Sequence, residues 1–378
     1  MIPSAISDHN AAVTALWADY GRQANERVPI VFASDEALWL KLTGESFGRF
    51  YEDPAVQLEV QLQGAAWFAE NVVHDRPMGP PADAWSVAPR FWMDEAEFFG
   101  CEVAVQQDTY AWSRPLLGSK PDILAQIEDI DPVGRVPETR LWALHAAMKN
   151  LCAGLEWRGL PVNVAFPGGG THGVFTVACH VRGAEALCMD LAEDPDFAFE
   201  FLGLITEKIV GKIAAWHRLL GTGAELPGPG WGMCDDSIQF ISAETYRRSV
   251  LPHHERIYSA MTTGLRTLHL CGHSAQHYRA LYETLGVTVL DGPGPFVDHG
   301  GFLAEMPKLS FNGQVDHTVL LLGPPSAIDD MLRGMLTDAA KQPGRLNIMG
   351  YVGPETPMPH VQAMYEAGQR HGRIALPA

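Results

Sequence analysis

Residues 267–292, TLHLCGHSAQHYRALYETLGVTVLDG, hold the pattern that decides the fold. Two short apolar runs, TLHLCG and VTVLDG, each end at a turn, and a helical segment separates them. Alternation of short strands with helices is typical of α/β folds with a parallel sheet. The rest of the chain repeats this unit.

Eight short runs of this kind predict strands, and helical segments lie between them. They are residues 28–33, 102–108, 162–166, 230–236, 267–272, 287–292, 309–313 and 346–350. Eight strands alternating with helices predict an α/β fold, a (β/α)8 TIM-type barrel. We expect one barrel domain over residues 1–378, with an N-terminal helical extension over about 1–27 and an insertion around 120–158.

Aspartate-proline pairs mark the starts of two predicted helices. Asp53-Pro54 and Asp194-Pro195 combine an N-cap residue with proline at the first helical position. After the second pair an apolar stripe runs at helical spacing through Phe197, Phe201, Ile205, Ile209, Ile213, Trp216 and Leu220. Ser242 begins a further predicted helix, and we expect Pro252 to kink or stop it.

The composition favours a globular protein and excludes several classes of partner. Apolar residues make up 47% and charged residues 19%, with a net charge of -18. Such an acidic chain is a poor match for nucleic acid or an anionic membrane. The first residues have no basic and apolar leader, no run is long enough to span a membrane, and the six cysteines are spread out. We therefore expect a cytoplasmic protein with reduced cysteines that acts on a small molecule, and an oligomer is compatible with this.

The pair His269 and Cys271 is the sharpest local feature. Successive side chains on a strand alternate between faces, so both of these point the same way. An imidazole and a thiolate on one face at the end of a strand form half of a tetrahedral zinc site. The alternative is a buried cysteine beside a hydrogen-bonded histidine.

Asp235 and Asp236 follow Cys234 in the turn after another predicted strand. One carboxylate at this position is suited to bind a substrate, act as a base or ligate a metal. Aspartates at the start of a helix also serve to accept hydrogen bonds from free backbone N–H groups. Both interpretations stay open for each residue.

Other polar residues lie where predicted strands end, which is where a barrel of this class builds its active site. Asp291, Asn312 and Tyr351 occupy such positions. The glycines 168–170 are followed by Thr171 and His172, and they suit either a close approach of ligand to the backbone or a plain turn. Arg90 and Trp112 flank the second strand, where they either line the mouth of a pocket or pack on the surface. Asp298 precedes His299 and two glycines and is a candidate ligand or base.

The order of several longer segments resembles the uroporphyrinogen decarboxylase superfamily. The similarity extends from about Glu52 to His371, and the nearest branch is that of the zinc-dependent, corrinoid-linked methyltransferases of the O-demethylase type. It rests on YEDPAVQLEVQ, EAEFFGCEV, VRGAEALCMDLAEDPDF, CDDSIQFISAETYRRSVLPHHERI, LHLCG, GQVDHTVLLLGPPSAI and GPETPMPHVQAM. The resemblance implies a (β/α)8 barrel, in agreement with the strand count.

The resemblance also implies that His269 and Cys271 supply two zinc ligands. The branch commonly has a further cysteine in a Gly-Cys step after the last strand, and here that step reads Gly350-Tyr351. A complete site would need a substitute such as Cys234, Asp235 or Asp298. Tyr351 would then face the substrate.

These features predict a zinc-dependent methyltransferase. Zinc would activate a thiol or an ether oxygen, and a corrinoid on a separate protein, or tetrahydrofolate, would carry the methyl group. Asp235, Asp236 and Tyr351 are the expected catalytic residues, and the expected substrate-binding residues are Arg90, Trp112, His172, Asp291 and Asn312. Two alternatives remain: a metal-free decarboxylase that uses Asp235 to handle protons, and a binding barrel without catalysis.

Overall fold

The computed structural model describes residues 4–167 and 170–375, and these form two compact units. The first unit comprises the chain up to Glu45, Glu59–Trp85, and the chain from Thr288 onward. The second comprises Ser46–Leu58 and Ser86–Val287. Gly168 and Gly169 of the predicted glycine turn lie outside the described residues. Each unit is described by itself.

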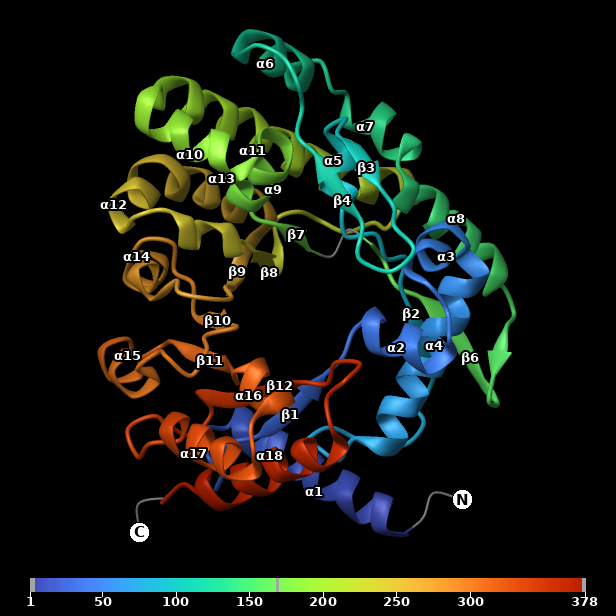
Figure 1. Cartoon of the computed structure of the whole chain (residues 1–378), viewed down its shortest axis with the longest axis vertical. Helices are drawn as coiled ribbons and strands as arrows, with labels where there is room; N and C mark the ends of the chain where they lie inside the picture. The colour runs from blue at the N-terminus through green and yellow to red at the C-terminus, as the bar shows by residue number, and fades with distance from the viewer. Residues whose placement is uncertain (1–3, 168–169, 376–378) are drawn as a thin grey trace. The chain divides into compact units, whose positions relative to one another are not determined.

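Four parallel strands form the sheet of the first unit, in the order β1 (Ile30–Ala33), β12 (Leu346–Tyr351), β11 (Ser310–Gln314) and β10 (Val289–Asp291). Figure 1 shows β1 and β12 side by side. These strands carry apolar residues that are fully buried, among them Ile30, Ile348 and Phe311. The helices are α1 (Ser4–Gly21), α2 (Glu36–Thr43), most of α4 (Pro54–Asn71), α15 (His299–Glu305), α16 (His317–Leu322), α17 (Pro325–Met335) and α18 (Met358–His371).

The parallel strands of the second unit run in the order β9 (Thr262–His269), β8 (Gly228–Cys234) and β7 (Thr171–His172). Two further sheets accompany them: β2 (Trp85–Val87), β6 (Leu160–Val164) and β5 (Glu156–Trp157) form one, and β3 (Glu102–Ala104) and β4 (Trp112–Arg114) form the other. The helices are α3 (Phe47–Glu52), α5 (Asp94–Phe98), α6 (Lys120–Glu128), α7 (Pro132–Arg135), α8 (Arg140–Leu151), α9 (Val174–Arg182), α10 (Ala184–Glu193), α11 (Pro195–Leu220), α12 (Ala243–Thr245), α13 (Leu251–Met261) and α14 (Tyr278–Glu283).

Parallel strands joined by helices confirm the predicted fold class, a TIM-type α/β barrel, but two strands were assigned to the wrong sheet. The strand predicted at 102–108 is β3, which pairs antiparallel with β4. The strand predicted at 162–166 is β6, which pairs antiparallel with β5 across a turn where Arg158 and Gly159 have positive φ. The parallel sheet instead uses β7. Its two residues are too few to show an alternating pattern.

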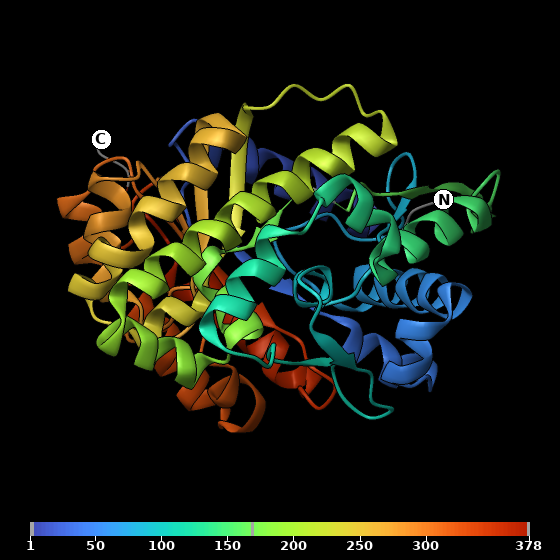
Figure 2. The ribbon, with the colours of Figure 1, turned by 90° about the horizontal axis from the view of Figure 1, so that it is seen from above.

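The helix starts at Asp53 and Asp194 are confirmed. The Asp53 carboxylate accepts hydrogen bonds from the first turn of α4, and that of Asp194 accepts one from Phe197 in α11. The long helix α11, yellow-green in Figures 1 and 2, packs against α9, α10 and α13 with its predicted apolar stripe buried through Trp216.

Of the two outcomes predicted for Pro252, a kink or a stop, the stop is wrong, because helical turns continue from Ala243 to Met261. A wide π-type turn over Tyr246–Val250 precedes Pro252, which lies in the first turn of α13, where no backbone N–H is needed. None of the helices in the described ranges has the length and apolar character required to cross a bilayer.

Candidate functional site

The neighbouring strands β8 and β9 bring a cluster of metal-ligating side chains together. Cys234 ends β8 and is paired in register with His269 at the end of β9. Asp236 follows two residues after Cys234, and one ligand atom from each of the three lies within 4.8 Å of the other two. The Cys234 thiol donates to Oδ2 of Asp236 at 3.2 Å, and Nε2 of His269 lies 3.8 Å from Oδ1 of Asp236.

Cys271 extends the cluster on the side of His269. Its Sγ lies 3.0 Å from Nε2 of His269, and its backbone N–H donates to the Asp236 carboxylate. Two thiols, an imidazole and a carboxylate are the ligand types that zinc takes in proteins. Burial, reinforced by the Asp236 carboxylate, raises the pKa of the Cys234 thiol, so a bound cation would have to displace that proton. Cys234, Asp236 and His269 therefore fit a zinc ion, while Cys271 contacts His269 but does not belong to this group of mutually close ligand atoms.

Asp235 is in different surroundings from Asp236, although the two are adjacent. Its side chain is fully buried and accepts hydrogen bonds from the backbone N–H groups of Phe175 and Thr176 at 3.1 and 2.7 Å. The Thr176 hydroxyl adds a bond of 2.7 Å, and Nε2 of His254 lies 2.7 Å away. This carboxylate is committed to the first turn of α9, a helix about 60 residues earlier in the chain, and it makes no capping hydrogen bond to the turn Asp236–Phe240 that it opens, so the helix-start interpretation is wrong for Asp235.

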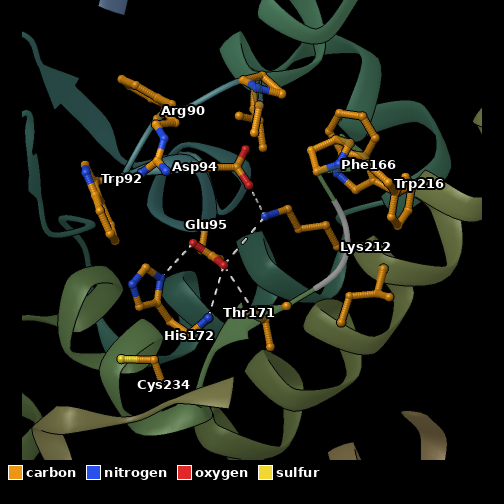
Figure 3. Close-up of a pocket in the computed structure, with 17 residues that line it drawn as sticks. Arg90, Trp92, Asp94, Glu95, Phe166, Thr171, His172, Lys212, Trp216 and Cys234 are labelled. Carbon is orange, nitrogen blue, oxygen red and sulfur yellow. Dashed lines mark hydrogen bonds and ion pairs between the residues drawn. The ribbon is translucent and has the colours of Figure 1, made fainter. Parts of the chain in front are cut away.

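A cavity of about 410 Å³ lies within the second unit and shares Cys234 with the metal-ligating cluster (Figure 3). Apolar and aromatic side chains make up much of its wall, and a group of charged side chains completes it. A cavity of this size and composition is typical of a site for a small molecule. It is lined by Ala88, Pro89, Arg90, Phe91, Trp92, Asp94, Glu95, Leu141, Phe166, Pro167, Gly170, Thr171, His172, Lys212, Ile213, Trp216 and Cys234.

Four ionisable side chains of the cavity, those of Asp94, Glu95, His172 and Lys212, form one connected group. Lys212 from α11 makes an ion pair with Asp94 from α5, and its Nζ lies 3.9 Å from Oε1 of Glu95. Glu95 in turn pairs with Nδ1 of His172 at 3.0 Å and accepts from the Thr171 hydroxyl at 3.2 Å. The dashed lines in Figure 3 follow these contacts.

Burial and the neighbouring charges together determine the ionisation of this group. Burial raises the pKa of Asp94 to about 6, against the lowering effect of Lys212. Burial also acts to raise the pKa of Glu95, but the charges of Lys212 and His172 outweigh it and hold that pKa well below its usual range. For His172 the burial effect is outweighed by Glu95, which raises the pKa of the imidazole. Glu95 is therefore the firmly ionised carboxylate of the two.

The sequence reasoning missed Asp94, Glu95 and Lys212. Lys212 did leave a signal, because it lies between Ile209 and Ile213 on the apolar stripe of α11, where a lysine must be buried with a partner. The two acidic residues left a weaker one. They open α5, and acidic residues in a first helical turn are commonly explained by the helix dipole alone.

The predicted substrate-binding residues are distributed over both units. Arg90 and His172 line the cavity of the second unit. Trp112 lies on β4, is 42% exposed and does not line that cavity; the Arg114 guanidinium lies over its ring. Asp291 and Asn312 belong to the first unit, where they are register partners; Asp291 ends β10, whereas Asn312 lies in the middle of β11 and not at its end as predicted.

Two other predicted residues also belong to the first unit. Tyr351 ends β12, and its ring lies 5.5 Å from that of His317. Asp298 accepts a hydrogen bond from the Gly301 backbone at the start of α15, and so serves as a helix cap. Among the further metal ligands considered from the sequence, Cys234 is the one grouped with His269.

Comparison with known proteins agrees with these observations. Residues 83–371 match the family described as uroporphyrinogen decarboxylase (URO-D). The chain belongs to the URO-D family. This membership confirms the predicted resemblance and accounts for the parallel α/β architecture.

Individual relatives in the comparison are methyltransferases. A stretch of 104 residues, 27% of this chain, is 35% identical to the methylated-thiol--coenzyme M methyltransferase of Methanosarcina mazei. The matched stretch spans about a quarter (26%) of that relative's length. A solved methyltransferase structure from Methanosarcina mazei covers 93% of this chain and 97% of its own, with a TM-score of 0.59 and 14% identity. The similarity to this solved structure shows that the two chains share a fold.

Proposed function

We propose that this URO-D family member is a methyltransferase that moves a methyl group between a small methylated substrate and a corrinoid or tetrahydrofolate carrier. The carrier would be bound to a separate protein. One observation carries the proposal: Cys234, Asp236 and His269 gather their ligand atoms within 4.8 Å, and Cys234 also lines the 410 Å³ cavity. The likeness to methyltransferases of Methanosarcina mazei supports the reaction class.

His269, Cys271, Cys234 and Asp236 would hold the zinc. When bound, zinc supplies a Lewis acid that polarises a thiol or ether group of the substrate. Cys234 places this cluster on the wall of the cavity, so a substrate lying there would meet it. Arg90 and His172 would orient the substrate from the same wall. The sequence expectation that Tyr351 takes part stays a prediction.

The surroundings of Asp235 weigh against the decarboxylase alternative. That reaction would require Asp235 to exchange a proton with substrate. Its carboxylate is fully buried, and the α9 backbone, Thr176 and His254 occupy its acceptor positions. The methyltransferase proposal does not require Asp235 to exchange a proton.

The test is the metal content of protein purified without chelators. We expect about one zinc per chain in the wild type and loss of most of it in Cys271→Ala and Cys234→Ala, because each removes a thiolate ligand. Cys188→Ala is the matched control, since Cys188 lies on α10, does not belong to the group of ligand atoms and should leave the zinc content unchanged. Methyl transfer from methyl ethers to a corrinoid should nearly vanish in Cys271→Ala.

The same measurement can overturn the proposal. If the wild type holds no zinc even after supplementation, the metal hypothesis fails. Equal zinc in the wild type and both ligand variants would place the metal elsewhere in the chain.

A further inference from the structure

Two neighbouring carboxylates on the cavity wall differ in their hydrogen bonds. Asp94 and Glu95 both belong to α5, and both line the cavity. Oε1 of Glu95 accepts from the Thr171 hydroxyl at 3.2 Å and from the His172 backbone N–H at 3.3 Å, and Oε2 lies 3.0 Å from Nδ1 of His172. Protein groups therefore satisfy both oxygens of Glu95.

Asp94 has a partner on one oxygen only. Its Oδ2 is paired with Lys212, whereas Oδ1 is buried and has no hydrogen-bond partner among residues 4–167 and 170–375. In Figure 3 a dashed line joins Asp94 to Lys212. Buried polar atoms without a partner are rare in native proteins, because an acceptor removed from water without a donor costs free energy. A donor brought in by a ligand would remove this cost.

Lys212 keeps the Asp94 carboxylate in one orientation. The lysine side chain is 8% exposed, contacts Oδ2 of Asp94 and lies 3.9 Å from Oε1 of Glu95. Turning the Asp94 carboxylate toward another protein donor would give up a buried, charge-assisted hydrogen bond. Oδ1 is therefore the oxygen that Asp94 has left for a ligand. Burial raises the pKa of Asp94 to about 6, and a donor on Oδ1 would favour its ionised form.

We propose that Asp94 is the specificity-determining residue of this cavity and that its Oδ1 accepts a hydrogen bond from an O–H or N–H group of the ligand. A hydroxyl and an ammonium share this chemistry. The rest of the ligand would lie against the rings of Phe91 and Trp216, which line the same cavity. The inference rests on the proposed methyl transfer only in calling the ligand a substrate.

The test is a binding series measured by calorimetry with no methyl carrier present. The donor probes are 2-naphthol and 2-naphthylmethylammonium; the reference is 2-acetylnaphthalene, which accepts hydrogen bonds but donates none. We expect at least one donor probe to bind the wild type about tenfold more tightly than the reference, because hydrogen bonds to a charged group are strong. The donor probe that binds shows whether the ligand carries a hydroxyl or an ammonium. A reference that binds as tightly as both donor probes overturns the proposal.

Asp94→Asn tests whether this carboxylate is the acceptor. The amide oxygen should stay with the Lys212 ammonium, so the amide N–H group would replace the unpartnered oxygen and offer a donor instead. The advantage of the donor probes over the reference should then vanish. Asp108→Asn, at an exposed position outside the lining, is the matched control and should keep that advantage. An advantage that survives in Asp94→Asn excludes Asp94 as the acceptor. The wild-type series still decides the donor preference should this variant fail to fold.

The two proposals can fail separately. Cys271→Ala should retain the donor preference, because Cys271 does not line the cavity. If the preference holds but the wild type transfers no methyl group and binds no zinc, the role of Asp94 stands and the methyltransferase proposal fails. If methyl transfer occurs but the donor probes have no advantage, the function stands and the role of Asp94 is wrong.

Discussion

Asp235 and Asp236 are adjacent and have identical side chains, but their surroundings give the two carboxylates different chemistry. Asp235 is fully buried and holds the first turn of α9, whereas the Asp236 side chain is 33% exposed and contacts two cysteines and a histidine. Sequence reasoning identified both residues but could not assign the roles. The partners of Asp235 are Thr176 and His254, 59 residues before it and 19 after it.

Gly173 tests the packing around Asp235 at the scale of one residue. A Cβ at position 173 would overlap the Asp235 carboxylate, so Gly173→Ala should lower the free energy of unfolding by roughly 1–3 kcal/mol. Gly170→Ala is the control, because its Cβ would meet nothing closer than the Gly232 carbonyl at 3.8 Å. Urea unfolding of both variants checks this. If the two variants are equally stable, the Asp235 carboxylate can move without loss of stability.

At the scale of elements, helix α11 joins the core to the cavity. Its apolar stripe was predicted from spacing alone and is buried from Phe197 to Trp216. The same helix carries two buried lysines, Lys208 and Lys212, with different partners. Lys208 donates to the Glu128 backbone carbonyl at 2.8 Å, while Lys212 compensates Asp94 and Glu95.

This difference predicts unequal costs for the same substitution. Lys212→Met leaves two buried carboxylates without their shared cation and should destabilise the protein by about 3–5 kcal/mol. Lys208→Met removes one hydrogen bond and a contact of 3.5 Å with the exposed Glu207 carboxylate, and it should cost about 1–2 kcal/mol. Thermal unfolding of the pair measures the difference, and similar melting temperatures would mean that Asp94 and Glu95 find other compensation.

Over the whole molecule, the sequence predicted architecture better than it predicted the site. Apolar runs and helix-start pairs are local signals, and six of the eight predicted strands lie in parallel pairings. The exceptions, β3 and β6, look like barrel strands but pair with chain neighbours in antiparallel hairpins. His269 and Cys271 were found because they share one strand, whereas the group around Lys212 joins α5, β7 and α11, which no local pattern links.

Two buried histidines whose pKa is strongly lowered, one taken from each unit, make stability depend on pH. Burial lowers the pKa of His74 in the first unit and of His253 in the second to about 4. Nδ1 of His74 accepts a hydrogen bond from the Phe32 backbone at 3.0 Å, which requires the neutral ring. Neither ring nitrogen of His253 has a hydrogen-bond partner within the described ranges. Both histidines therefore stay neutral in the folded state at pH values where the unfolded chain binds protons.

The sign of the effect follows from proton binding. Between pH 6.5 and about 4 the unfolded chain holds the extra protons, so stability falls as the pH falls, by on the order of 3 kcal/mol for each histidine. Asp94 acts in the opposite sense, because its raised pKa of about 6 favours the folded state as the pH falls below that value. Comparing variants with the wild type at each pH separates these contributions, since Asp94 is common to all of them.

His253→Leu and His74→Asn should therefore resist acid better than the wild type. Leucine needs no hydrogen bond at a site that supplies none, and asparagine can still accept from the Phe32 N–H. Urea unfolding at pH 7.5 and pH 5 should show a smaller loss of stability in each variant, because each lacks one group that protonates on unfolding. If the wild type and both variants lose the same stability between these pH values, the two histidines are not held neutral by burial.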